Sequence, residues 1–394
     1  MTVTSIDTRR SGDLAVMLTG GGARAAYQVG LLRGIARHFP DLRIQIITGV
    51  SAGAINAVFL AAHAGTLAER SAELAQAWST LECRHIFRFD YRSIIPFRSA
   101  IASVFPRKRW HHPRGVVDTS PLRELLLHMY HANPNQPIAG ISRNLKDGSL
   151  SSVAVITLDY STGQNVRWVQ GRNGGENFEG PNRRVVQTDL TIEHVLASAA
   201  LPFVFPAVQI GSGWHGDGGI RLAAPLSASV QLGASRIIAM STGYQRTFDE
   251  AAQPEVCGYP PTAQVLNQLV NAVFLDVIDE DVARMERMSE LLRHLDPEQR
   301  GALRPVDLLV LRPQVDLGKL AAEYEHYLPR SVKYATRALG AKQTESPDFV
   351  SLLMFEPHYT KRLIEIGEAD IESQLDKVRA FLGEESTEER EEAV

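Results

Sequence analysis

The chain has 394 residues and a formal net charge of −4, with 44% hydrophobic and 22% charged side chains. This length and composition allow a large core of more than one layer, and the mild acidity argues against a nucleic-acid-binding protein. Two cysteines, Cys83 and Cys257, cannot build a disulfide framework, and neither a signal-peptide core nor a run of roughly 18 apolar residues is present, so we expect a cytoplasmic protein.

The first predicted strand, residues 14–18, runs into a glycine-rich loop that is followed by a helix over residues 24–39. The loop contains three successive glycines: Gly20, Gly21 and Gly22. Such a run exposes backbone N–H groups and removes side chains from their path. We therefore expect this glycine loop to hold an anion or a developing oxyanion.

A dinucleotide-binding turn is the alternative interpretation of the same loop. Gly20, Gly22 and Ala25 fit the looser form of that fingerprint, and Asp41 falls near the distance expected of a ribose-binding acid. Asp41 precedes the next predicted strand instead of ending it, however. The dinucleotide interpretation also leaves the following motif unexplained.

A second strand, residues 43–48, leads into Gly49-Val50-Ser51-Ala52-Gly53, and a helix follows over residues 52–64. Strand, sharp turn with a central serine, then helix is the context of a nucleophile elbow. The glycines allow a tight turn, and the helix N-terminus beside Ser51 favours negative charge. A turn without chemistry is the alternative.

The segment from Arg84 to Arg114 has a positive net charge, opposite to that of the whole chain, because it contains a single acid, Asp90. Basic side chains interleaved with aromatic rings favour contact with an anionic membrane surface. An ordinary insertion with its aromatics in the core is the main alternative, and nucleic-acid binding is a weaker one. The cations are Arg84, Arg88, Arg92, Arg98, Arg107, Lys108, Arg109 and Arg114.

Strand-like and helix-like runs continue to alternate along the chain, which predicts an α/β fold with a mostly parallel central sheet covered by helices on both faces. Catalytic residues then belong at the carboxyl ends of strands. The further strands are expected at residues 152–159, 166–170, 236–241 and 307–312, and the further helices at 67–81, 120–130 and 192–199.

The third notable motif is Trp214-His215-Gly216-Asp217-Gly218-Gly219. Glycines on both sides let the acid approach another loop closely. Asp-Gly is also a strong turn dipeptide, so a hairpin without chemistry is the alternative. His215 could in principle complete a Ser-His-Asp triad, although a histidine that only lines the site is favoured.

From about residue 260 the apolar side chains recur at helical spacing as far as residue 296, which predicts a long amphipathic helix. A final helix is expected at residues 359–382. We thus divide the chain into a catalytic domain, residues 14–241, a helix-rich C-terminal region, residues 260–383, and an acidic, solvated tail, residues 384–394.

The three motifs, in this order, resemble those of the patatin-like phospholipases, a family of lipid acyl hydrolases. The stretch from Ala197 to Pro206 is similar to the family's sequence before the acidic motif. The resemblance implies a patatin-like fold in which Ser51 is the nucleophile, Asp217 its only partner, and the glycine loop the oxyanion hole. The supporting positions would be Arg24, Gly49, Gly53, Gly218 and Gly219.

The resemblance further implies a lipid ester substrate, with phospholipids leading, and no metal or organic cofactor. Arg24 would bind a substrate phosphate or brace the glycine loop through a salt bridge. Ala25 departs from the family, which usually has glycine there. A lipid-binding or scaffold protein that keeps the fold but turns over little is therefore the second hypothesis, and Ala25 is its support in the sequence.

Overall fold

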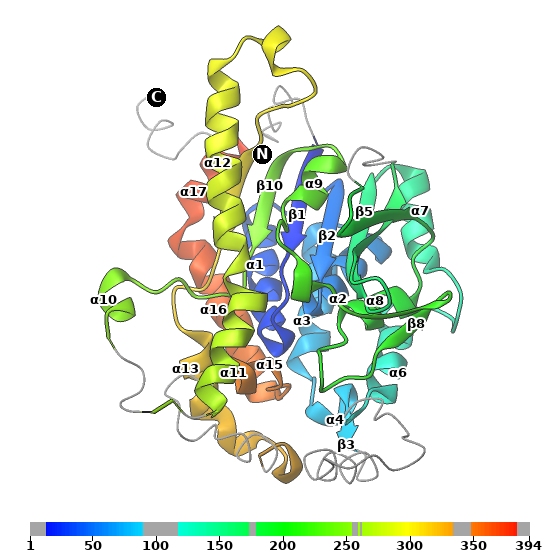
Figure 1. Ribbon diagram of the computed structural model, residues 1–394, viewed down its shortest axis with the longest axis vertical. Coiled ribbons are helices and arrows are strands. Elements are labelled where there is room, and N and C mark those ends of the chain that lie inside the picture. The colour runs from blue at the N-terminus through cyan, green and yellow to red at the C-terminus, as the bar shows by residue number, and fades with distance from the viewer. Residues whose placement is uncertain are drawn as a thin grey trace, which may run out of the picture.

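The computed structural model describes residues 13–89, 117–172, 179–253, 259–260, 262–333 and 348–383, and Figure 1 shows how their elements are arranged. The predicted acidic tail lies outside the described residues. Of the basic segment, only Arg84 to Phe89 lies within them.

A nine-stranded sheet forms the centre of the described part of the chain. Five strands are parallel and follow the order β11-β10-β1-β2-β5. They are β1 (Asp13–Leu18), β2 (Ile46–Val50), β5 (Ser152–Asp159), β10 (Ala234–Met240) and β11 (Asp307–Leu311). The mostly parallel sheet predicted from the alternation of strands and helices is confirmed.

The other side of the sheet is antiparallel at β5. There β5 pairs with β6 (Asn165–Gly171) along one edge and with β9 (Gly213–Asp217) along part of the other. β7 (Arg183–Gln187) adds parallel to β6, and β8 (Val208–Ile210) forms a hairpin with β9. The sequence did not predict β7, because its two arginines and partly exposed side chains lack the apolar run of a buried strand. A separate antiparallel pair joins β3 (Arg88–Phe89) to β4 (Val117–Asp118).

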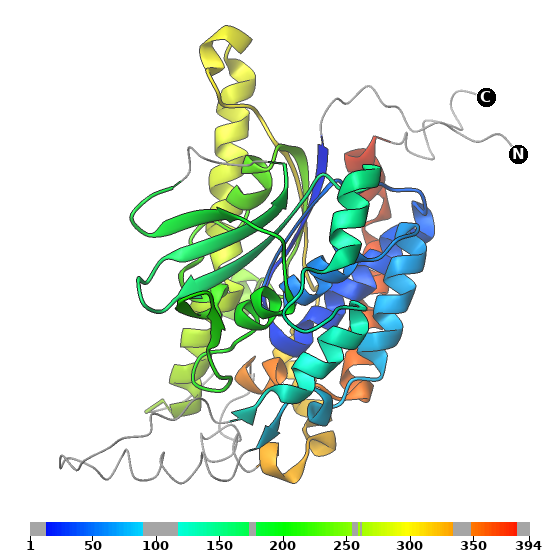
Figure 2. The same cartoon turned by 90° about the vertical axis from the view of Figure 1, so that its right-hand side faces the viewer.

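Helices cover both faces of the sheet (Figure 2). The α-helices of the described residues are α1 (Ala25–His38), α2 (Ala52–Ala62), α3 (Leu67–Ser79), α4 (Cys83–Ile86), α6 (Ser120–Met129), α7 (Ala139–Asp147), α8 (Ile192–Ser198), α9 (Ser227–Gln231), α10 (Phe248–Ala251), α11 (Thr262–Val270), α12 (Val277–His294), α13 (Leu317–Tyr324), α15 (Asp348–Leu352), α16 (Pro357–Ser373) and α17 (Leu375–Leu382).

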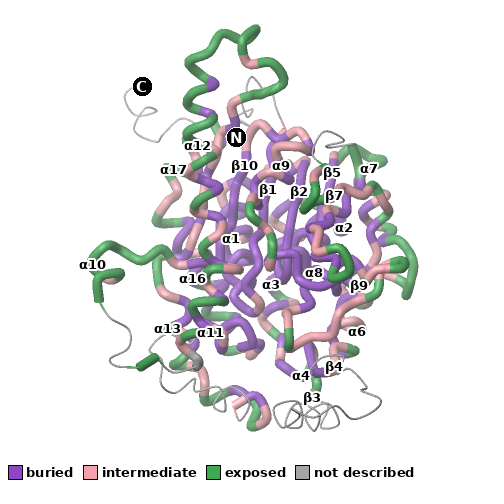
Figure 3. The backbone as a smooth tube through the Cα atoms, in the orientation of Figure 1, coloured by how far each residue is buried: buried purple, intermediate pink, exposed green. Residues whose placement is uncertain are grey.

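Alternate side chains of β1 show how the two faces are filled. Leu14, Val16 and Leu18 enter the large hydrophobic cluster that also contains α1, α2 and α16. Ala15 and Met17 enter a second cluster, on the face of α9 and α12. Because successive residues of a strand point to opposite faces, the unbroken apolar run of β1 serves both layers. Figure 3 shows the resulting buried centre and the exposed far end of α12.

The predicted long C-terminal helix is present, with one internal change of geometry. α11 continues into a π-helical segment, η4 (Asn271–Leu275), before α12 begins. π-helical segments inside α-helices are frequently found at functional sites. The predicted final helix is divided at Gln374 into α16 and α17.

α16 packs directly on α1, so the C-terminal region shares its core with the N-terminal half of the chain. Gly30 and Gly34 on α1 face Ile364 and Ile371 at distances that leave no room for a Cβ. The hydroxyl of Tyr27 donates to Asp370 at 2.8 Å across the same interface. Among the described residues, every helix is too short or too polar to cross a bilayer.

Candidate active site

Ser51 occupies a sharp turn between β2 and α2. Its backbone has φ 56° and ψ −134°, close to the region that only glycine ordinarily occupies. Such strain is typical of a nucleophile elbow, where the turn directs the serine side chain away from the sheet. The residue is buried, with 6% of its surface exposed. The predicted strand, turn and helix are all present.

Ser198, at the end of α8, fixes this turn to the neighbouring strand. Its hydroxyl accepts from the Ser51 N–H at 2.9 Å and donates to the Ile156 carbonyl of β5 at 2.7 Å. No sequence pattern singled out Ser198, although it lies in the stretch from Ala197 to Pro206 that carried the resemblance. Gly53 and Gly49 let α2 lie against β1 and β2, because a Cβ at either position would collide with backbone or side-chain atoms.

The strand register brings Asp217 to Ser51. β2 pairs with β5 as far as Ile156, opposite Val50, and the chain then turns away at Ser51. From the next residue of β5, Thr157, the same edge pairs with β9 instead, and the partner of Thr157 is Asp217. Serine and aspartate therefore meet at the point where one strand replaces the other.

Asp217 is fully buried and has few partners. The N–H of Gly219 donates to its Oδ1 at 2.9 Å. Burial raises the pKa of Asp217 from 3.8 to about 7, although hydrogen bonding from the Ser51 hydroxyl and from the Gly219 N–H opposes the rise. A carboxyl with this pKa can accept a proton near neutral pH.

The second carboxylate oxygen of Asp217, Oδ2, has no hydrogen bond of good geometry within the described part of the chain. The Ser51 hydroxyl lies near enough to the carboxyl to lower its pKa, and Oδ2 still has room for a closer hydrogen bond. Catalytic hydrogen bonds are often long or poorly aligned before substrate binds. A buried oxygen without a partner, next to a serine on a strained turn, could receive a proton from that serine.

The glycine loop runs beside the nucleophile. A Cβ at Gly20 would lie 2.9 Å from the Cβ of Ser51, so only glycine permits this approach. Gly21 and Gly22 have φ values of 149° and 54°. The hydroxyl of Thr242, after β10, donates to the Gly20 carbonyl at 2.5 Å and holds the loop in place. Thr242 is a further residue that the sequence did not identify.

Ala25 begins α1 with φ −63° and ψ −14°, which is ordinary helical backbone. Alanine adopts this conformation without strain. The departure from the family's usual glycine therefore leaves the backbone of the loop undisturbed. The carbonyl of Ala25 accepts a hydrogen bond from Asn56 at 3.1 Å.

Arg24 connects the glycine loop to the C-terminal region. Its side chain is buried, forms an ion pair with Asp348, and donates to the Ser351 hydroxyl at 2.6 Å. Asn271 of η4 donates to the same aspartate at 2.9 Å. Of the two roles considered for Arg24, this arrangement favours the salt bridge that holds the glycine loop to the C-terminal region.

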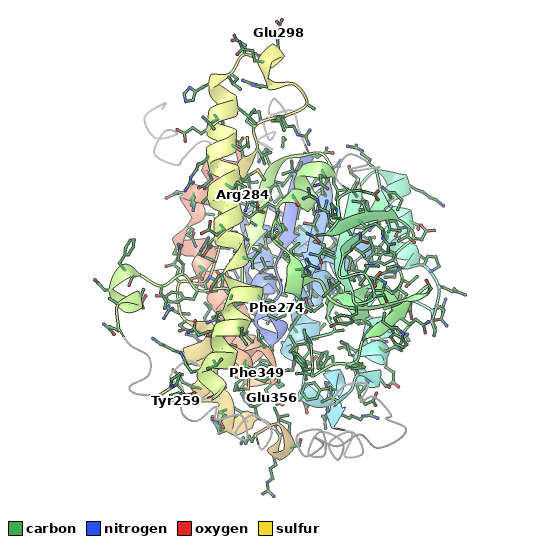
Figure 4. All side chains as sticks on the ribbon, viewed as in Figure 1. Tyr259, Phe274, Arg284, Glu298, Phe349 and Glu356 are labelled. Atoms are coloured by element: carbon green, nitrogen blue, oxygen red, sulfur yellow. The ribbon has the colours of Figure 1, made fainter. Side chains whose placement is uncertain are left out.

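Gly218 and Gly219 begin a short 3₁₀ segment after β9. A Cβ at Gly218 would collide with the carbonyl of Ile156, and one at Gly219 would lie 2.8 Å from the ring of Phe274. The predicted close approach of this loop to another element is therefore present, and a simple hairpin turn does not describe it. Phe274 belongs to η4 and is labelled in Figure 4.

His215 lies on β9 with its side chain buried. Its Nδ1 is 3.2 Å from the hydroxyl of Thr157, and burial lowers its pKa. Its ring also packs edge-on against Trp168. These contacts account for the histidine as a buried residue beside the site. Asp41 lies in the turn before β2 and not at its carboxyl end, unlike the ribose-binding acid of a dinucleotide site.

An apolar pocket opens at Ser51. Its walls are apolar apart from the serine and the backbone of the glycine loop. Side chains from segments that are distant in the sequence form these walls, and the sequence did not predict their convergence. They include Ile55, Trp78, Leu81 and Ile86, then Leu122, Leu126 and Met129, then Leu201 and Phe205, and finally Phe274, Leu352 and Phe355.

A family model described as patatin-like phospholipase matches residues 16–229, which include the glycine loop, Ser51 and Asp217. No curated protein matches the chain in sequence. VipD from Legionella pneumophila is a similar solved structure, with 13% identity and a TM-score of 0.40 over 93% of this chain and 67% of that one. Human GIVD cytosolic phospholipase A2, solved with methyl gamma-linolenyl fluorophosphonate, has 13% identity and a TM-score of 0.43 over 94% of this chain. The aligned region spans 59% of the human chain.

Proposed function

This chain belongs to the patatin-like phospholipase family, and from that premise we propose that it is a serine acyl hydrolase that cleaves fatty-acyl esters of lipids, with phospholipids as the leading substrates. The proposed machinery is a dyad of Ser51 and Asp217 with the glycine loop as oxyanion hole. The observation that carries the proposal is the fully buried carboxyl of Asp217, whose pKa is raised to about 7, beside a serine on a strained turn.

A serine hydroxyl is a poor nucleophile at neutral pH and needs a base. In the first step Asp217 takes the hydroxyl proton of Ser51 on its unsatisfied Oδ2 while the serine oxygen bonds to the ester carbonyl carbon. The carbonyl oxygen becomes an oxyanion. When the tetrahedral intermediate collapses, the ester C–O bond breaks and Asp217 returns the proton to the leaving alcohol.

The oxyanion would lie against the backbone amides of Gly21 and Gly22. Their positive φ angles and the brace from Thr242 preorganise this loop beside Ser51. Donors fixed in advance stabilise charge that develops in the transition state, and losing one typically lowers turnover about 10²–10³-fold. In the second half of the reaction Asp217 takes a proton from the water that attacks the acyl-enzyme carbonyl. It gives this proton to the Ser51 oxygen when the acyl C–O bond breaks and the fatty acid leaves.

The pocket supports a fatty-acyl substrate. Its apolar walls begin at Ser51 and offer no charged side chain among their members, so they suit a hydrocarbon chain whose carbonyl carbon lies at the serine. The head group would then lie outside the pocket. Peripheral contact with an anionic membrane through the segment from Arg84 to Arg114 belongs to the same proposal.

Covalent labelling with a fluorophosphonate tests the proposal. We expect the wild type to be labelled at Ser51, with no labelling of Ser51→Ala and strongly slowed labelling of Asp217→Asn, because that variant keeps the serine but lacks the base. Hydrolysis of a lipid ester should fall in parallel. A folded protein that binds lipid but is neither labelled nor active would favour the scaffold hypothesis.

A further inference from the structure

Three side chains of types that bind metal ions come together on or next to helices that line the pocket. They are His63, directly after α2, Glu73 on α3, and His131, just after α6. One ligand atom of each lies within 4.8 Å of the other two. Glu73 follows His63 by ten residues and His131 lies much farther along the chain, so no metal-binding motif marked the cluster in the sequence.

His63 has the hydrogen bonding of a histidine prepared to bind a metal. Its Nδ1 lies 2.9 Å from the Phe59 carbonyl, so this nitrogen carries the proton and Nε2 presents its lone pair. Ligating histidines almost always donate their other ring N–H in this way. The side chain is 9% exposed, and Nε2 is buried without a hydrogen-bond partner among the described residues.

A hydrogen-bonded ion pair does not account for this geometry. Nε2 of His63 lies 3.7 Å from the Glu73 carboxylate, which is too long for a hydrogen bond. By contrast, the His38–Glu372 pair on the same protein closes to 3.0 Å. A neutral His63 presents the Nε2 lone pair to a negatively charged carboxylate, and a bound cation would offset the repulsion between them. The separation is near the roughly 3.4 Å between two ligands of a tetrahedral zinc ion.

We propose that His63, Glu73 and His131 form a binding site for a divalent transition-metal ion, with Zn²⁺ as the best fit and water as the fourth ligand. Two imidazoles and one carboxylate are a donor set that zinc accepts. The site is separate from Ser51 and Asp217 and takes no part in ester cleavage.

The metal would clamp the three helices that form one wall of the pocket. α2 contributes Ile55 to that wall, α3 contributes Trp78 and α6 contributes Leu126. Each ligand stands on or next to one of these helices. Because the ion would bind the folded protein and not the unfolded chain, it should stabilise the fold by mass action.

Titration of the full-length, metal-free protein with Zn²⁺ in a calorimeter tests the site. His131→Ala and Glu73→Gln are the informative variants, because both side chains are exposed and neither should be needed for folding. We expect each to weaken binding of one Zn²⁺ equivalent by more than about tenfold, since even outer-shell partners of a metal ligand contribute that much. The rise in melting temperature that Zn²⁺ causes in the wild type should disappear in both.

His38→Ala is the matched control. His38 also faces a glutamate, Glu372, but it does not belong to the cluster of His63, Glu73 and His131. This variant should bind Zn²⁺ like the wild type. The proposal is overturned if the wild type binds no Zn²⁺ equivalent, if either informative variant binds as tightly as the wild type, or if the control weakens binding as much as they do.

Discussion

Replacing Asp217 with asparagine should make the protein more stable at neutral pH, even though it removes the proposed base. Burial raises the pKa of this carboxyl from 3.8 to about 7, so the folded protein holds a proton that the unfolded chain releases. The group's contribution to stability is therefore full below pH 3.8 and is lost as the pH rises to about 7. At 1.36 kcal/mol for each pKa unit, the whole loss is about 4 kcal/mol. Asparagine resembles the neutral acid and cannot ionise, so the variant avoids the loss.

Urea unfolding of the wild type and of Asp217→Asn from about pH 5 to about pH 8 measures the effect. The difference in free energy of unfolding, variant minus wild type, should grow by about 3 kcal/mol over this range. Asp147→Asn is the control, because hydrogen bonds from Ser149 lower the pKa of that carboxyl, which then stays ionised throughout. A difference for Asp217→Asn that changes by less than about 1 kcal/mol would refute the reasoning.

Three further predictions concern catalysis, backbone strain and membrane contact. In a pH–rate profile, kcat/KM should fall about tenfold for each pH unit below about 7, because the base must be ionised. His215→Ala should keep this inflection and at least about a tenth of the wild-type rate. A folded His215→Ala protein that loses as much activity as Ser51→Ala would contradict the dyad. In urea unfolding, Ser51→Gly should be more stable than Ser51→Ala by about 1–2 kcal/mol, because glycine relieves the backbone strain; equal stability would argue against that strain. Changing Arg107, Lys108 and Arg109 to Glu should weaken sedimentation with anionic vesicles more than hydrolysis of a soluble short-chain ester, and unchanged vesicle binding at low salt would exclude the membrane contact.

The local parts of the site could be predicted from the sequence because each is carried by a short segment. The turn at Ser51 needs only an apolar strand, two glycines and a helix, and all of these lie within about twenty residues. The placement of the turn at the carboxyl end of a parallel strand followed from the alternation of elements. The pairing of Ser51 with Asp217 came from the family resemblance, since no local pattern links the two positions.

The rest of the site depends on contacts between distant segments. Ser198 bridges Ser51 to β5, and Arg24 reaches Asp348 in the C-terminal region. Neither partner has a pattern of its own, because a serine at a helix end and an aspartate in a short helix are common. The cluster at His63 is a similar case. Its ligands become neighbours only once α2, α3 and α6 have packed.

If the proposed mechanism holds, the C-terminal region connects the basicity of Asp217 to the binding of the acyl chain. Phe274 of η4 packs over Gly219, whose N–H binds Asp217, and it also lines the pocket. One ring thus helps to exclude water from the carboxyl and to form the apolar wall. Desolvation is the main cause of the raised pKa, so a chain lying in the pocket would preserve the same dry environment during proton transfer. In the proposed mechanism, the long helix beyond the region matched by the family model therefore belongs to the site, because it covers the carboxylate that would act alone as the base.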